Sequence, residues 1–67
     1  MPYVNIKVTP ANVTPEKKAE LIKGVTDVLV NVLGKNPEST FVVIDEIAPE
    51  AWGIGGESVA ERRRRHT

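Results

Sequence analysis

The feature that most constrains the fold is a single apolar stripe between residues 21 and 33. Its members recur at three- and four-residue spacing, which predicts one face of an amphipathic helix of about five turns. Thr14 can cap the start of this helix, Pro15 needs no amide partner at the first position, and Gly34 favours the left-handed backbone that ends a helix. The stripe consists of Leu21, Ile22, Val25, Val28, Leu29, Val32 and Leu33.

Two segments with strand patterns flank this helix. Residues 3–9 alternate apolar and polar side chains, as a half-buried strand does, whereas residues 40–47 are nearly continuously apolar, as in a strand buried on both faces. A strand, a crossover helix and a second strand form a βαβ unit with parallel strands. Residues 48–56 are rich in glycine around Trp52 and predict a surface hairpin. We therefore expect an α+β fold, a single βαβ unit with a short C-terminal hairpin.

The chain is too short to bury a sufficient core of its own. It has 67 residues, no cysteine and a single histidine, His66, so disulfides and metals do not compensate for its small size. The helix covers one face of the two strands, and the other face, which includes Phe41, needs apolar cover from a second copy. We expect one domain at residues 1–61, a basic tail at residues 62–67, and self-association.

The composition names no partner. Nine acidic and nine basic residues give a net charge of zero, which does not indicate binding to nucleic acid or to a membrane. No segment approaches the roughly 18 apolar residues of a membrane span, and the start of the sequence lacks a signal-peptide pattern. The expected location is the cytoplasm.

The usual catalytic constellations are missing from the sequence. No set of histidine, cysteine and carboxylate side chains exists for a nucleophilic triad or a zinc site. Residues 53–56 lack the glycine spacing of a phosphate-binding loop. Asp45 and Glu46 are neighbours in a predicted strand, so they point to opposite faces and do not form an acid–base pair. We therefore expect no metal site.

The N-terminus offers one unusual group, Pro2. An initiator methionine before proline is normally removed, and removal of Met1 would convert Pro2 into a secondary amine with a free lone pair. Such an amine is more basic than an ordinary α-amino group, whose pKa is about 7.7–8.0. Burial in an apolar pocket would lower its pKa toward neutrality. If Met1 is retained, the nitrogen of Pro2 is an amide and has no basic lone pair.

Four segments together resemble the 4-oxalocrotonate tautomerase family over nearly the whole chain. They are residues 2–8 (Pro-Tyr-Val-Asn-Ile-Lys-Val), 14–22 (Thr-Pro-Glu-Lys-Lys-Ala-Glu-Leu-Ile), 42–46 (Val-Val-Ile-Asp-Glu) and 52–57 (Trp-Gly-Ile-Gly-Gly-Glu). The resemblance implies a homohexamer, built as a trimer of dimers, with pockets between subunits and no cofactor. It also implies that Pro2 is the general base, which moves a proton of a 2-hydroxy-enoate or enol substrate to a distant carbon.

The resemblance also implies two pocket residues. Trp52 stands where the family usually carries an aromatic residue that lines the pocket and keeps the base desolvated. Ser39 matches a serine at the pocket edge, although a place in a surface turn fits this residue equally well.

One departure from the family pattern bears on the substrate. Well-known members hold carboxylates with two arginines, but here the loop before the helix has Asn12 and Val13, and the second-strand position has Phe41. Charge-assisted contacts contribute about 1.5–3 kcal/mol each, so loss of both costs roughly 10²- to 10⁴-fold in rate. A hydrophobic pocket of Phe41 and Trp52 instead suits an aryl or alkyl enol with at most one carboxylate, similar to phenylenolpyruvate.

Other cations could replace the missing arginines. Lys7 could reach a neighbouring pocket, but its place in a strand favours a solvated lysine. Arg62–Arg65 could fold over a pocket, but a charge run of this kind favours a mobile, solvated tail.

Two other functions stay open. A hydratase or dehalogenase of the same fold would need a carboxylate that activates water, and no acid stands at the expected place. A catalytically weak or inactive hexamer could serve as a binding or scaffold protein, whose Arg62–Arg65 runs would attract nucleic acid by charge. The only aromatic residues are Tyr3, Phe41 and Trp52, which offer little base stacking.

Overall fold

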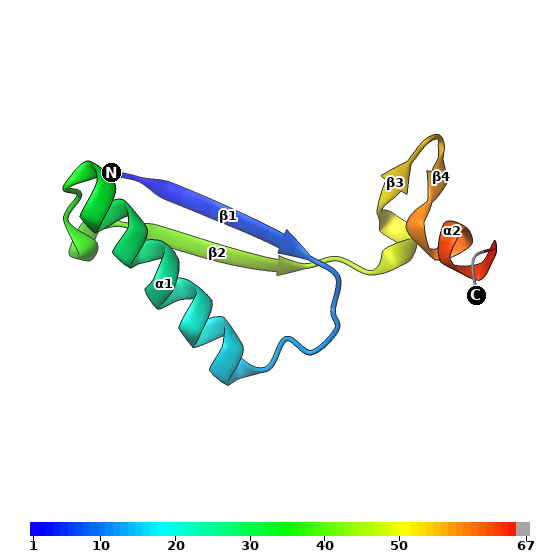
Figure 1. The fold of residues 1–67 in the computed structure, drawn as a ribbon, viewed down its shortest axis with the longest axis horizontal. Coiled ribbons are helices and arrows are strands. Elements are labelled where there is room, and N and C mark those ends of the chain that lie inside the picture. Colours follow the sequence, from blue (N-terminus) through cyan, green and yellow to red (C-terminus); the bar gives the residue numbers. More distant parts are fainter. Residues whose placement is uncertain (66–67) are drawn as a thin grey trace.

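A computed structural model describes residues 1–65 of the chain (Figure 1). The helices and strands follow a strand–helix–strand order and continue into a small C-terminal unit. In chain order they are β1 (Tyr3–Val8), α1 (Pro15–Leu33), the 3₁₀ turn η1 (Pro37–Ser39), β2 (Phe41–Glu46), the 3₁₀ turn η2 (Pro49–Ala51), β3 (Gly53–Ile54), β4 (Glu57–Ser58) and α2 (Val59–Arg65).

The strands β1 and β2 are adjacent and parallel, which confirms the predicted βαβ unit. Their register pairs Tyr3 with Phe41 and Val8 with Glu46, and α1 lies along one side of them (Figure 1). The apolar run of β2 predicts burial on both faces, but Phe41 and Val43, on the side away from α1, are exposed. The reason is that one chain supplies helical cover on one face only.

Both ends of α1 are set by the residues that the sequence indicates. Thr14 Oγ1 accepts a hydrogen bond from the N–H of Lys17 at 3.2 Å, and Pro15 fills the first position. Gly34 ends the helix with a φ of 65°. In the preceding loop Asn12 has a φ of 60°, a left-handed conformation that asparagine adopts more readily than most residues. The connection from β1 to α1 therefore turns without a glycine.

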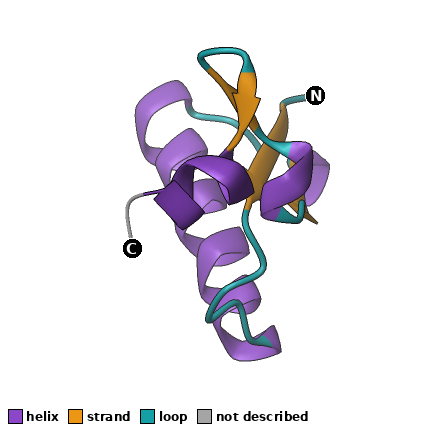
Figure 2. Cartoon of the chain, turned by 90° about the vertical axis from the view of Figure 1, so that its right-hand side faces the viewer, coloured by secondary structure: helices purple, strands orange, loops and turns teal. Residues whose placement is uncertain are grey.

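The C-terminal residues form a unit beyond the carboxyl ends of β1 and β2 (Figure 1). Strands β3 and β4 are antiparallel, and Gly55 and Gly56 between them have φ values of 62° and 85°. Two positive φ values in a row are what a two-residue hairpin turn requires, and the predicted hairpin is confirmed. Figure 2 looks onto this end of the molecule, with α2 nearest the viewer.

The helix α2 includes Arg62–Arg65, which the charge run predicts to be a mobile, solvated tail. These residues are solvent-exposed but helical. Arg64 pairs with Glu61 one turn earlier, and Arg65 pairs with Glu57 in β4; pairs at i,i+3 spacing stabilise a helix. The arginine run is therefore helical and, as predicted, solvent-exposed, and residues 66–67 of the predicted tail lie outside the described part.

Within residues 1–65, no residue is buried in the single chain. The accessible surface is 5001 Å², whereas a compact protein of this mass exposes about 4,200 Å². The molecule measures 45 × 25 × 15 Å, and Tyr3, Phe41 and Val32 are 65%, 50% and 73% exposed. The chain therefore lacks a core of its own, which supports the prediction of self-association.

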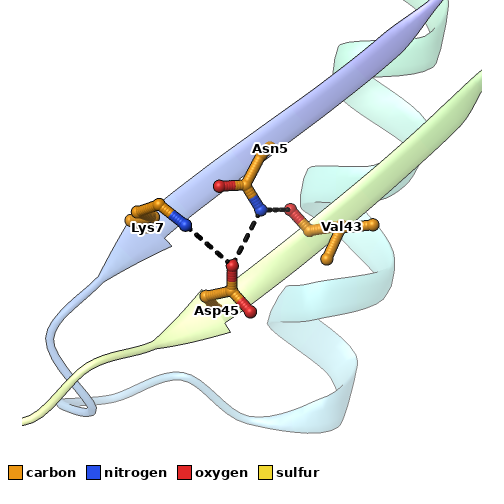
Figure 3. Close-up of polar contacts among 4 residues, drawn as sticks. All are labelled: Asn5, Lys7, Val43 and Asp45. Carbon is orange, nitrogen blue, oxygen red and sulfur yellow. Dashed lines mark hydrogen bonds and ion pairs between the residues drawn. The ribbon is translucent and has the colours of Figure 1, made fainter.

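The side of the sheet away from α1 is uncovered, and we call it the bare face. It consists of Tyr3, Asn5 and Lys7 of β1 with Phe41, Val43 and Asp45 of β2. At one end of it Asn5, Lys7 and Asp45 form a polar cluster (Figure 3). Asn5 Nδ2 donates to Asp45 Oδ2 at 2.9 Å and to the Val43 carbonyl at 3.3 Å, and Lys7 Nζ lies 3.0 Å from the same carboxylate oxygen.

This cluster fixes the ionisation and direction of Asp45. The hydrogen bond from Asn5, followed by the hydrogen bond and charge of Lys7, holds the pKa of Asp45 below its ordinary value. On the other side of β2, Glu46 pairs with Lys18 of α1 at 3.2 Å. Asp45 and Glu46 therefore point to opposite faces, as the sequence predicts.

We expect the thermal unfolding midpoint to rise with protein concentration. An assembly gains stability by mass action, whereas a chain that folds alone unfolds at a temperature independent of concentration. Val43→Asp should dissociate the assembly, because it places a charge on the bare face. Calorimetry and sedimentation equilibrium over the same concentrations measure both effects. A monomeric mass with a constant midpoint would contradict self-association.

We expect Asp45→Asn to lower the free energy of unfolding at pH 7. In acid, the variant and the native chain should have the same free energy of unfolding. A carboxylate whose pKa is lowered by folding contributes stability above its unfolded pKa, about 3.9, and loses it as pH falls through the folded value. Urea unfolding at pH 7 and below pH 3, at one protein concentration, measures the difference. The control is Asp27→Asn, which removes an exposed i,i+4 pair with Lys23 worth about 0.3–0.5 kcal/mol. An equal loss at both pH values for Asp45→Asn would show that charge is not the cause.

Candidate active site

Pro2 lies directly before β1 and is held in the parallel ladder. Its carbonyl accepts a hydrogen bond from the N–H of Phe41 at 3.0 Å, and its side chain is half-buried. Met1, which precedes it, is 89% exposed. Removal of Met1 would therefore leave Pro2 tied to β2 through its carbonyl while its nitrogen becomes the chain terminus.

Two of the predicted pocket residues lie at the same end of the sheet as Pro2. Phe41 is opposite Tyr3 on the bare face and is 50% exposed. Ser39 ends η1, and its Oγ donates to the Asn36 carbonyl at 3.3 Å. The Ser39 hydroxyl thus has a partner within the turn, which favours the turn role; its role at a pocket edge stays a prediction.

Trp52 lies at the opposite end of the strands. Its Nε1 donates to the Ile47 carbonyl at 2.9 Å, and its own carbonyl accepts from the N–H of Val59 at 2.8 Å. Since Ile47 is six strand positions beyond Phe41, Trp52 lies on the order of 20 Å from Pro2 of the same chain. The predicted pocket of Phe41 and Trp52 is therefore not formed within one chain and would need a second copy.

A hollow of about 380 Å³ opens beside Trp52, and we call it the Trp52 pocket. It combines residues from the end of β1 with residues from the C-terminal unit. Its lining consists of Lys7, Val8, Thr9, Trp52, Val59 and Arg63. The structure thus brings one strand lysine and one arginine of the basic run to the predicted aromatic residue. The contributions of Val59 and Thr9 were not predicted, because they depend on how the C-terminal unit folds back.

Lys7 is solvent-exposed, as the solvated interpretation predicts, and it is also ion-paired. It is half-exposed, lines the Trp52 pocket, and its Nζ forms the 3.0 Å ion pair with Asp45 described above. Its positive charge is therefore partly offset by the neighbouring carboxylate.

A second hollow, of about 510 Å³, runs along the first turns of α1. It is lined by Asn12 and Val13 of the preceding loop and by helix residues that include Leu21 and Val25. Pro2, Ser39, Phe41 and Trp52 are not part of its lining, so it is separate from the predicted site.

Two findings limit the kinds of site within the described part of the chain. In residues 1–65, no group of three or more His, Cys, Asp or Glu side chains could hold a metal ion. Over the same residues, no helix is long and apolar enough to cross a membrane. The absence of a cofactor and the cytoplasmic location stay predictions.

Comparisons with known proteins agree on one family. The model of the family described as "Tautomerase enzyme" matches residues 2–62. A probable tautomerase of Dickeya dadantii, K2, is 59% identical over 64 residues, which cover 96% of each chain.

Solved structures show the same relationship. DmpI from Helicobacter pylori is 48% identical, with a TM-score of 0.82 over 90% of this chain and 98% of that one. A heterohexamer 4-oxalocrotonate tautomerase from Chloroflexus aurantiacus is 26% identical, with a TM-score of 0.79 over 91% of this chain and 97% of that one. Since the family model and a relative of almost equal length both span nearly all of the sequence, the chain belongs to the tautomerase family of isomerases.

Proposed function

We propose that this tautomerase interconverts an enol and a keto form of a small carboxylic acid, with Pro2 as the general base after removal of Met1. The observation that carries the proposal is the position of Pro2, next to β1 and tied to Phe41 at 3.0 Å. A terminal amine held in this way has a fixed direction, whereas most chain ends fray.

The proposed reaction is a proton shuttle. The lone pair of the Pro2 nitrogen takes the proton of the enol hydroxyl, and the electrons of that O–H bond form the carbonyl. The electrons of the enol carbon–carbon double bond form a C–H bond with the proton that the prolinium nitrogen returns to the carbon next to the new carbonyl. Atoms and charge balance over the cycle, because Pro2 ends in its starting form.

The Pro2 nitrogen needs a dry environment for this role. Desolvation disfavours the ammonium form and lowers the pKa of an amine. In one chain Pro2 is only half-buried, so we propose that a neighbouring copy completes the cover with its Trp52. The separation of Pro2 and Trp52 along the strands supports this arrangement.

We propose a homohexamer as the working assembly. The lack of a buried core in residues 1–65 supports an assembly of several copies. The Chloroflexus aurantiacus relative is described as a heterohexamer, which supports the number of subunits. In a homohexamer, identical chains would supply both Pro2 and Trp52 to each pocket.

The residues at the two family arginine positions favour a substrate with one carboxylate. Phe41 stands in place of one family arginine, and Asn12 and Val13 stand near the place of the other. An aromatic enol acid such as phenylenolpyruvate therefore suits this site better than a dicarboxylate.

A catalytically inactive scaffold is the alternative. A scaffold that binds nucleic acid needs unpaired positive charge on α2, but Arg64 and Arg65 are paired with Glu61 and Glu57. These pairs reduce the charge that a phosphate backbone would meet, which favours the enzyme.

We expect Pro2→Ala to reduce turnover of phenylenolpyruvate by about 10²-fold or more, since a positioned general base contributes about 10²- to 10⁴-fold. The measurement is the rate of ketonisation followed by ultraviolet absorbance, together with intact mass to establish that Met1 has been removed. Circular dichroism and sedimentation should be unchanged.

A matched control keeps the proline but blocks its nitrogen. A chain with one extra residue before Pro2 has an amide at this position and should be as inactive as Pro2→Ala. Full turnover by the blocked chain, or by a native chain whose mass includes Met1, would rule out Pro2 as the base.

A further inference from the structure

We propose that the Trp52 pocket is the binding site for the carboxylate and ring of an aromatic acid, with Arg63 as the residue that holds the carboxylate. This inference deepens the proposed function, on which it rests for the identity of the substrate class. Binding to the pocket can nevertheless be measured without turnover.

The lining of the pocket comes from three separate elements, each held in place by its own contacts. Lys7 and Val8 come from the end of β1, and Trp52 is anchored by its indole N–H to the Ile47 carbonyl at 2.9 Å. Val59 and Arg63 lie four residues apart in α2, which places them on the same side of the helix. Figure 2 shows α2 in front of the strands at this end. The helix therefore presents an apolar group and a cation to one hollow.

The charges around the pocket single out Arg63. In β4 and α2 the carboxylates are engaged, Glu57 by Arg65 and Glu61 by Arg64; within residues 1–65, Glu50 of η2 has no ion pair. Lys7 shares its charge with Asp45 at 3.0 Å. Within residues 1–65, Arg62 and Arg63 have no ion pair. Of these two, Arg63 lines the pocket, so it is the pocket cation whose charge is left for a ligand.

The lining matches an aromatic acid in chemistry and size. A guanidinium can form two parallel hydrogen bonds to a carboxylate, and an indole ring contacts another ring favourably. Val8 and Val59 add apolar surface. The volume, about 380 Å³, falls in the range of small-molecule sites, about 300–1,000 Å³. Arg63, the unpaired cation of the pocket lining, can bind one carboxylate of a ligand.

The single tryptophan gives a direct test. Trp52 is the only tryptophan of the chain, so its fluorescence reports on this pocket. Phenylacetate and phenylacetamide are matched probes that differ in charge. At fixed ionic strength we expect phenylacetate to bind about tenfold more tightly, since about 1.4 kcal/mol corresponds to a factor of ten and a charge-assisted hydrogen bond reaches this size.

Two variants of equal charge separate Arg63 from its neighbour. Arg63→Gln should weaken phenylacetate binding about tenfold and leave phenylacetamide binding unchanged, which also reports that the pocket is still folded. Arg62→Gln, the matched control, should keep the preference for the acid. Equal losses in both variants, or equal affinities of the two probes for the native chain, would overturn the proposal.

Failure of this inference and failure of the proposed function give different results. Pro2→Ala should lose turnover but still prefer phenylacetate in the fluorescence titration. If Pro2→Ala retains turnover, the general base is wrong while the Arg63 site stands. If Arg63→Gln binds phenylacetate as tightly as the native chain, the Arg63 site is wrong while Pro2 is unaffected.

Discussion

The structure depends on one constraint: its apolar side chains need to be buried, and a single chain does not bury them. A two-stranded sheet with one helix leaves its bare face and its outer edges open. Full burial of a side chain such as Phe41 or Leu33 contributes about 1.5–3 kcal/mol, whereas a whole domain is stable by about 5–15 kcal/mol. Because Leu33 and Phe41 are 60% and 50% exposed here, cover from other copies in the proposed assembly would provide a large share of the stability.

The parallel strands β1 and β2 connect the burial of apolar side chains with the proposed chemistry. Pro2 is hydrogen-bonded to Phe41 at one end of the ladder, and Trp52 is hydrogen-bonded to Ile47 just beyond the other. The strands therefore separate the proposed base from the proposed binding pocket. In the proposed assembly, a second copy that covers the apolar end of the bare face would also exclude water from Pro2, so the same contact would add stability and favour the neutral amine.

The sequence predicted those features that depend on local patterns. The helix limits follow from Thr14 and Gly34, and the hairpin follows from Gly55 and Gly56, because caps and turns require particular residue types at particular places. The helix α2 was missed because its arginine run has no apolar periodicity. The pairing of Lys7 with Asp45 depends on the strand register, which neither residue's neighbours specify.

Register also accounts for the charge of the Trp52 pocket. Because Lys7 lies opposite Asp45, a carboxylate of the protein already occupies one side of the lysine, at 3.0 Å. A ligand with two carboxylates would have to compete with Asp45 for Lys7, and the released aspartate would repel it. A ligand with one carboxylate meets Arg63 and leaves the Lys7–Asp45 pair intact. In the proposed pocket, the Lys7–Asp45 ion pair would thus select against dianionic substrates.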